Sequence, residues 1–252
     1  MSTVTSERVS ERQETSPQVY ARLCGALYFY IIVAGLFAEI FVRSKLVVPG
    51  DAAATAANIT ANELLFRIGF SGELLHLTFD VMVAALLYVL LRPVDRTIAL
   101  MAAFFRLTSD VILAVASISH FAALRLLGGA DYLATFQPEQ LQTLALLALK
   151  LHGDGYSICL AFFGFACLAL GHLIYKSTFL PKTIGVLMAI AGACYLLNSF
   201  VGFLSPAIAG KLFPVLFAPI FIAELTLALW LLVKGVDLPK WHLVNAALRR
   251  SG

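Results

Sequence analysis

Residues 66–91, FRIGFSGELLHLTFDVMVAALLYVLL, decide the fold of this chain. The stretch is long enough to cross a bilayer, because a hydrocarbon core of about 30 Å needs about 20 helical residues. It also places Glu73, His76 and Asp80 within an otherwise apolar run. Charged groups are costly in contact with lipid, so we expect these three side chains to face the interior of a helix bundle. The segment therefore predicts a membrane helix with one polar face.

The composition of the whole chain agrees with this prediction. Of its 252 residues, 60% are hydrophobic and 13% are charged, whereas soluble domains contain about 25% charged residues. The predicted spans are residues 20–42, 66–91, 97–124, 154–175, 183–204 and 212–233. Turn or charge signals close each span, as RPVD does at 92–95. The fold class that follows is an all-α integral membrane protein, a bundle of six transmembrane helices.

The distribution of Lys and Arg predicts the orientation. With the N-terminus inside, eleven of the eighteen Lys and Arg residues fall on the inner side and five on the outer side. Cytoplasmic loops carry the excess of these residues, so we expect both termini in the cytoplasm. Residues 1–18 then form a disordered cytosolic tail, 19–236 the six-helix transmembrane domain, and 237–252 a short cytosolic tail. The polar N-terminal stretch lacks the features of a secretory signal.

Two outer loops are expected to contain short interfacial helices. An Ala-rich stretch follows Asp51, and residues 60–63, TANE, fit a capping box before the second span. A further helix is predicted to begin within 136–141, where Pro stands near its N-terminus. From there to the end of the fourth span a continuous helix would exceed one crossing of the bilayer. We therefore expect a break or bend at 152–155, HGDG, where two glycines flank an Asp.

Buried polar residues sort into two layers when depth is counted at about 1.5 Å per residue. The middle layer consists of Asp80, Arg106, Asp110 and Glu224. Arg106 and Asp110 are spaced i, i+4 on one helix face and can pair directly. We expect the four side chains to form one hydrogen-bonded network inside the bundle. The network is either an ion-pair staple for helix packing or a group of catalytic residues that handle protons or substrate.

The outer layer consists of Glu39, Glu73, His76, His152 and Asp154. Glu73 and His76 are spaced i, i+3, the Glu-x-x-His spacing with which helix bundles present ligands to a metal. Imidazoles and carboxylates together suit zinc, iron or manganese, so these five residues are candidate metal ligands. Two alternatives remain open for the same residues. They can be hydrogen-bonding groups of a hydrated vestibule, or a general acid and base that work without metal.

Other potential sites give weaker signals. His120 and His172 lie near the ends of their spans, and we expect both to be interfacial rather than ligands. The four cysteines lie in apolar runs without metal-ligand spacing, as buried unpaired thiols do. The sequence contains no phosphate-loop, nucleophile-elbow or His-Glu-x-x-His motif. It also lacks a basic stretch with interleaved aromatic residues, so we expect no nucleic-acid partner.

Several longer phrases resemble a known family. They are ARLCGALYFYIIVAGLFAEIFVRSKLVVPGDAAATAANI, LLRPVDRTIALMAAFFRL, LHGDGYSICLAFFGFACLALGHLIYKSTFLPKTIGVLMAIAGACYLLNSF and ELTLALWLLVKGV. In this order they resemble a bacterial multi-pass membrane family, domain-of-unknown-function family 4386, over residues 21–236. The resemblance implies a bacterial cytoplasmic-membrane protein with one helical domain. It implies no activity, so it assigns no catalytic role to any residue.

Three functions fit these observations. The first is an intramembrane enzyme, with or without a metal, that acts on a lipid or isoprenoid-like amphiphile from the outer leaflet. The second is a small proton-coupled transporter, because carboxylates embedded in a membrane are typical of ion pathways. A homodimer could supply the missing half of such a path. The third is a non-catalytic subunit that binds or stabilises a membrane-protein partner.

Overall fold

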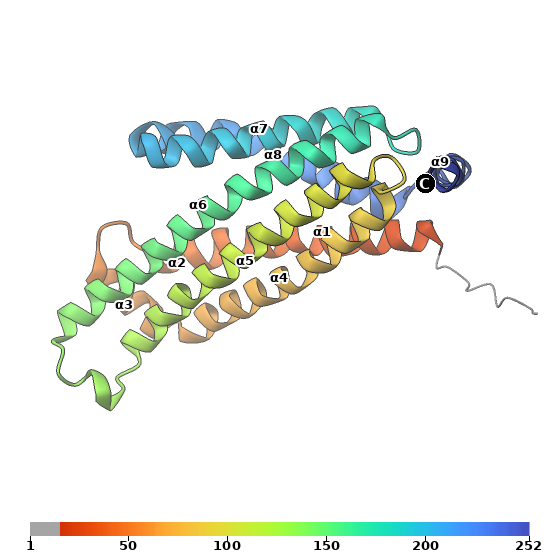
Figure 1. Cartoon of the computed structure of the whole chain (residues 1–252). Helices are drawn as coiled ribbons and strands as arrows, with labels where there is room; N and C mark the ends of the chain where they lie inside the picture. Colours follow the sequence, from red (N-terminus) through yellow and green to blue (C-terminus); the bar gives the residue numbers. More distant parts are fainter. Residues whose placement is uncertain (1–15, 252) are drawn as a thin grey trace, which may run out of the picture.

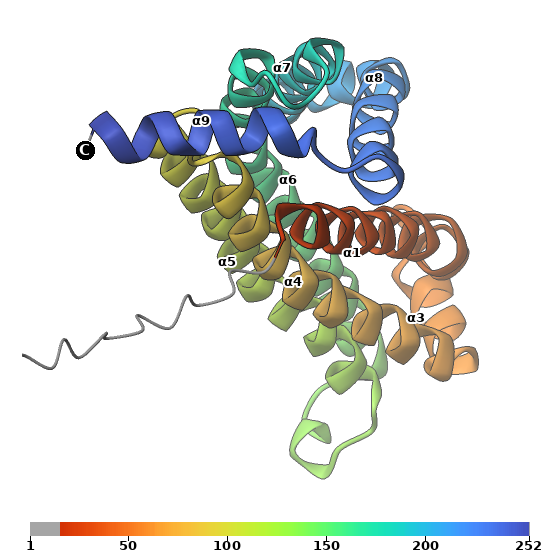
Figure 2. The ribbon, with the colours of Figure 1, turned by 90° about the vertical axis from the view of Figure 1, so that its right-hand side faces the viewer.

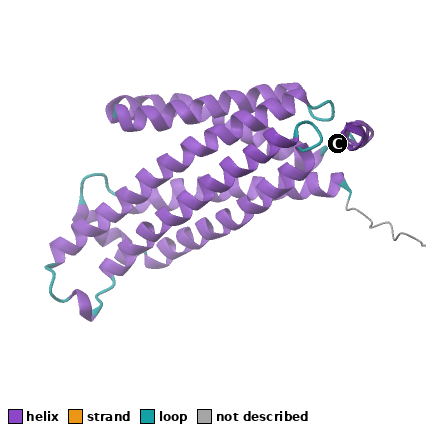
Figure 3. Cartoon of the chain, in the orientation of Figure 1, coloured by secondary structure: helices purple, strands orange, loops and turns teal. Residues whose placement is uncertain are grey.

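The computed structural model describes residues 16–251, and every regular element in that range is helical (Figure 3). The elements are α1 (Pro17–Phe37), the π-helix η1 (Ala38–Arg43), α2 (Ser44–Leu46), α3 (Ala52–Ala61), α4 (Glu63–Leu91), α5 (Arg96–Leu127), the 3-10 helix η2 (Asp131–Leu133), α6 (Pro138–Lys176), α7 (Lys182–Leu204), α8 (Pro206–Val233) and α9 (Leu238–Ser251). Six helical stretches are long and apolar enough to cross a membrane. The prediction of an all-α, six-helix membrane protein is confirmed. Most of the tail predicted at 1–18 lies outside the described residues.

The six long helices form a closed ring. Helices α4, α5, α6 and α7 each pack against the next helix in the chain, and α1 packs against both α4 and α8. Figure 2 shows α1 between α4 and α8. Helix α1 begins and α8 ends at the same end of the bundle, which we call the terminal end; the opposite, distal end contains α3 (Figure 1). Which end faces the cytoplasm remains a prediction.

The ends of the helices follow from local chemistry. The Asp95 side chain accepts a hydrogen bond from the backbone N–H of Ile98 at 2.9 Å, and this N-cap begins α5. Pro138 occupies the first turn of α6, where its missing N–H costs nothing. Helix α8 ends at Val233, and Gly235 two residues later has a φ of +69°, which favours glycine, and an N–H that donates to the Trp230 carbonyl at 2.9 Å.

The short helix predicted after Asp51 is confirmed as α3, which lies at the distal end. The Asp51 side chain caps it. The capping box predicted at 60–63 is wrong. Asn62 is the residue before α4, and its side chain makes no capping hydrogen bond. The Thr60 hydroxyl donates instead to the Ala56 carbonyl at 2.9 Å, because Thr60 lies within the last turn of α3 and the carbonyl four residues earlier is within its reach.

A break or bend is predicted at 152–155, and the break is wrong, because α6 runs without interruption for 39 residues. At about 1.5 Å per residue it is about 58 Å long, and α3 packs against it at the distal end. Gly155 serves close packing rather than a break. A Cβ added to Gly155 would lie 2.5 Å from the Cβ of Ala116 on α5. Small residues at such positions let membrane helices approach closely.

Glycines also allow α6 and α7 to pack closely. A Cβ at Gly171 would lie 2.7 Å from the Gly185 carbonyl oxygen, and one at Gly192 would lie 2.7 Å from the Gly164 carbonyl oxygen. Both distances are shorter than real Cβ atoms tolerate. The two helices therefore pack backbone against backbone at these glycines.

Residues 238–251, within the predicted C-terminal tail, form helix α9, which lies across the terminal end of the bundle (Figure 2). Trp241 is buried there, and its indole N–H donates to the Leu90 carbonyl at 2.9 Å. The side chain of Gln18 at the start of α1 accepts from the Val236 N–H at 3.0 Å. These contacts fix the chain between α8 and α9 to the ends of α1 and α4.

Candidate functional site

An ion pair between α4 and α5 occupies the middle of the ring. The Arg106 guanidinium donates from Nε to Asp80 Oδ2 at 2.9 Å and from its terminal nitrogen to Asp80 Oδ1. Each of the two residues is only 3% exposed. Such a two-pronged, charge-assisted pair is the strongest geometry available to these side chains.

Aromatic rings enclose the charge of Arg106. Its guanidinium carbon lies 4.6 Å from the ring centre of Tyr28 on α1 and 4.9 Å from that of Phe163 on α6. The negative faces of aromatic rings attract cations, most strongly where water is excluded. Four helices thus contribute to the stabilisation of one buried cation.

The other two residues predicted for the middle layer have different partners. Arg106 forms its ion pair with Asp80 and not with Asp110, because Asp80 reaches it from the neighbouring helix with both oxygens. Asp110 is 8% exposed and lies within hydrogen-bonding distance of the Asp80 carboxyl. Glu224 on α8 accepts a hydrogen bond of 2.5 Å from the Tyr195 hydroxyl on α7. The predicted layer therefore consists of two neighbouring groups.

A second cluster joins α4, α5 and α6 closer to the distal end. Glu73 Oε1 lies 3.1 Å from His152 Nε2, and Glu73 Oε2 lies 3.2 Å from His120 Nδ1. The Ser117 hydroxyl also donates to Glu73 Oε1. The side chains of Glu73, His120 and His152 are 14%, 15% and 11% exposed. A carboxylate and two imidazoles thus face one another within the bundle.

Neighbouring rings hold the imidazoles in place. The ring centres of His120 and His152 are 4.7 Å apart, and the Phe66 ring meets His120 edge-on at 4.7 Å. One donor atom from each of Glu73, His120 and His152 lies within 4.8 Å of the others. Small displacements would bring all three to the distances at which nitrogen and oxygen ligate a transition metal, about 2.0–2.2 Å. We call these three residues the Glu–His–His cluster.

The structure brings together only part of the predicted outer layer. Glu73 and His152 meet as expected, whereas Glu39 and Asp154 are exposed. Glu39 lies 3.9 Å from Arg43 on its own helix. Asp154 follows His152 by two residues, which turns it about 200° around α6 and away from the cluster. His76 is half-buried and contributes no donor atom to the cluster.

The cluster includes His120, although its position near the end of its span predicts an interfacial side chain. A helical stripe could have identified it. Asp110, Ser117 and His120 lie at i, i+7 and i+10 on α5, so all three share the face that turns toward the bundle interior. His172, by contrast, is exposed on α6.

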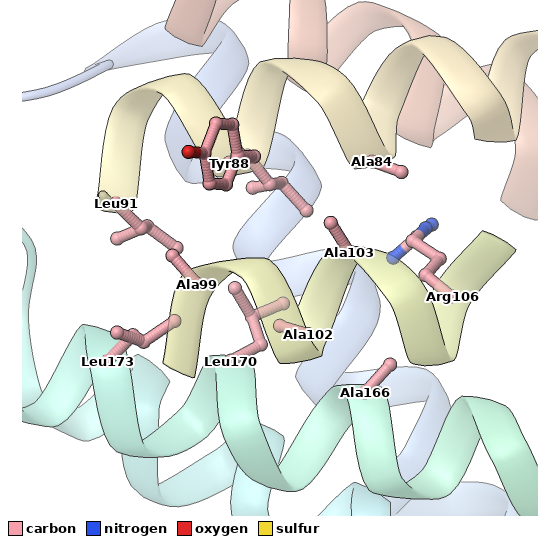
Figure 4. A pocket seen from close by; sticks show the side chains of 11 residues that line it. Ala84, Tyr88, Leu91, Ala99, Ala102, Ala103, Arg106, Ala166, Leu170 and Leu173 are labelled. Carbon is pink, nitrogen blue, oxygen red and sulfur yellow. The ribbon is translucent and has the colours of Figure 1, made fainter. Parts of the chain in front are cut away.

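A pocket runs from Arg106 toward the terminal end, between α4, α5 and α6. Arg106 lies at one end of the pocket, and Leu91 and Leu173 lie at the other (Figure 4). Five of its eleven lining residues are alanines: Ala84, Ala99, Ala102, Ala103 and Ala166. Short side chains on three adjacent helices leave this space unfilled.

These features define a class: a polytopic helical membrane protein with a buried ion pair and a separate carboxylate–imidazole cluster. The chain belongs to the family described as a domain of unknown function, DUF4386, whose model matches residues 23–235. It is similar to an uncharacterized protein of Archaeoglobus fulgidus, with 30% identity over 167 residues that cover 65% of this chain and 82% of that protein. No solved structure matches the chain. The resemblance to the family inferred from the sequence is confirmed.

Proposed function

We propose that the protein is a metal-dependent intramembrane enzyme that acts on a lipid or isoprenoid-like amphiphile. The observation that carries this proposal is the Glu–His–His cluster, in which donor atoms from three helices converge within 4.8 Å. One carboxylate and two imidazoles are a ligand set of catalytic zinc sites, and they also suit iron and manganese. We therefore revise the predicted ligand set to Glu73, His120 and His152.

The arrangement supports catalysis better than a purely structural metal. Glu73, His120 and His152 would hold the metal through three protein ligands, and a metal so held would supply an activated water as nucleophile near neutral pH. Ser117 hydrogen bonds to Glu73 and fixes its carboxylate, as partners of metal ligands do. The reaction class we propose is hydrolysis at a polar linkage of the amphiphile.

The position of the cluster supports an amphiphilic substrate. All three residues lie in helices that are long and apolar enough to cross a membrane. A substrate with a hydrocarbon tail can reach such a depth from the bilayer, whereas a fully hydrated solute has to lose its water first. With both termini in the cytoplasm, the cluster would face the outer leaflet of a bacterial cytoplasmic membrane. This orientation and this location are part of the proposal.

The test begins with metal content. Protein purified in detergent without a His-tag is analysed by mass spectrometry for zinc, iron and manganese, beside Glu73→Gln, His120→Ala and His152→Ala. The exposed His172→Ala variant on α6 is the matched control. We expect about one metal per chain in the wild type and the control, and a loss of at least tenfold in each cluster variant. A metal-free wild type would refute the proposal.

The second measurement addresses the reaction. Lipid extracts of cells that overproduce the wild type or Glu73→Gln are compared by mass spectrometry. We expect a lipid species to be depleted by the wild type alone, with a product that differs from it by the elements of water. Bound metal together with unchanged lipids would refute the enzyme and would leave a metal-binding membrane protein.

A further inference from the structure

The carboxyls of Asp80 and Asp110 cannot both be ionised without leaving a buried polar atom unsatisfied. Asp110 lies within hydrogen-bonding distance of Asp80. An ionised carboxylate only accepts hydrogen bonds, so two of them in contact have no hydrogen to share. In agreement with this, Asp110 Oδ2 is buried and has no hydrogen-bond partner among the described residues.

The charges around the pair lead to the same conclusion. Arg106 is the cation that pairs with Asp80, and both oxygens of Asp80 already accept from it. The other titratable groups within electrostatic range of Asp80 or Arg106 include His76, Tyr28, the carboxyl of Glu224 on α8, and the thiols of Cys24 and Cys167. Two carboxylates beside one guanidinium leave an excess negative charge at a site from which water is excluded. Such a charge costs several kcal/mol unless a proton neutralises it.

We propose that Asp80 and Asp110 bind one proton between them, so that the middle of the bundle is a proton-binding site. The proton resides on Asp110, whose hydroxyl donates to Asp80, while Asp80 keeps its charge and its two bonds to Arg106. The alanine-lined pocket adjoins the site, since Arg106 lines that pocket and contacts Asp80 directly, and it is the route by which we expect the proton to exchange. This inference does not depend on the metal site.

Infrared spectroscopy tests the protonation directly. A protonated carboxyl gives a carbonyl-stretch band that ionised carboxylates lack. Films of the protein in lipid are measured at about pH 8, where exposed carboxyls are ionised. We expect one acid band in the wild type, its loss in Asp110→Asn, and its persistence in Glu224→Gln, which removes the half-buried carboxyl of the middle layer on α8.

Isotope labelling keeps the test valid if Asp110→Asn does not fold. Wild-type protein labelled with ¹³C at the aspartate carboxyls should show the band shifted to lower frequency. A wild type without an acid band, or a band that is lost in Glu224→Gln and unaffected by aspartate labelling, would overturn the proposal.

The route through the pocket has its own test. After transfer to D₂O, the acid band shifts as the proton exchanges. Ala103→Leu fills the pocket, and the exposed Ala114→Leu on the same helix is the matched control. We expect exchange to slow at least severalfold in Ala103→Leu alone. Equal exchange rates in both variants would refute the route.

Discussion

Removal of the Asp80 carboxylate tests how strongly the buried ion pair stabilises the fold. All variants in this experiment carry Asp110→Asn, so that the second carboxyl cannot replace the first as the partner of Arg106. Asp80→Leu then leaves the guanidinium between two aromatic rings, without either of its charge-assisted hydrogen bonds. Each such bond contributes about 1.5–3 kcal/mol. A buried charge left without its partner costs about 3–5 kcal/mol overall, and we expect a loss of that size.

The double replacement provides the decisive comparison. Asp80→Leu combined with Arg106→Met removes both charges and fills the space with apolar atoms. Replacing a whole buried pair in this way is often close to neutral, so we expect the double variant to be more stable than Asp80→Leu. The free energy of unfolding is measured by titration of mixed detergent micelles with SDS, followed by tryptophan fluorescence. Additive losses from the two substitutions would refute the reasoning, because they would mean that the two charges do not interact.

Two further predictions concern packing. Gly185→Ala should lower the free energy of unfolding by about 1–3 kcal/mol, because its Cβ would lie 2.6 Å from the Tyr175 backbone nitrogen. The control is Gly202→Ala on the same helix, whose Cβ would meet nothing within 4 Å. This control should be neutral or stabilising in thermal unfolding. Trp241→Phe should cost about 1 kcal/mol, because it removes the N–H that donates to Leu90. That variant should also be cut faster by protease between α8 and α9, and an unchanged cleavage rate would contradict the docking of α9.

The spans were predictable from the sequence because a membrane leaves few choices. Backbone groups in lipid must be satisfied within helices, so a long apolar stretch such as 66–91 has one stable conformation. The glycines at 152–155 were ambiguous for a physical reason. Glycine permits either a break or a close helix contact, and only the position of Ala116 on α5 decides between them. That position depends on tertiary packing, which the local sequence does not contain.

For the candidate site, the sequence predicted the height of each residue along the bundle but not the direction in which its side chain points. Counting residues placed Glu73 and His152 at similar heights, and the structure brings them within 3.1 Å of each other. Depth alone also favoured Asp154, although a residue two positions from His152 points to the other side of the helix. The same method assigned His120 to the interface by its distance from the end of its span. His120 shares the helix face of Asp110, and that shared face predicts a side chain that points into the bundle.

The two sites lie close together, but apolar residues separate them. On α4 and α5, Leu77 lies between Glu73 and Asp80 in sequence, and Leu113 lies between Asp110 and Ser117. These two leucines pack together in one buried apolar cluster, so no hydrogen-bonded path runs through them. Removal of metal from the Glu–His–His cluster with a chelator should therefore leave the infrared band of the shared proton unchanged. A change in that band would contradict this separation and would identify His76, which is in electrostatic range of both Glu73 and Asp80, as the residue that couples the two sites.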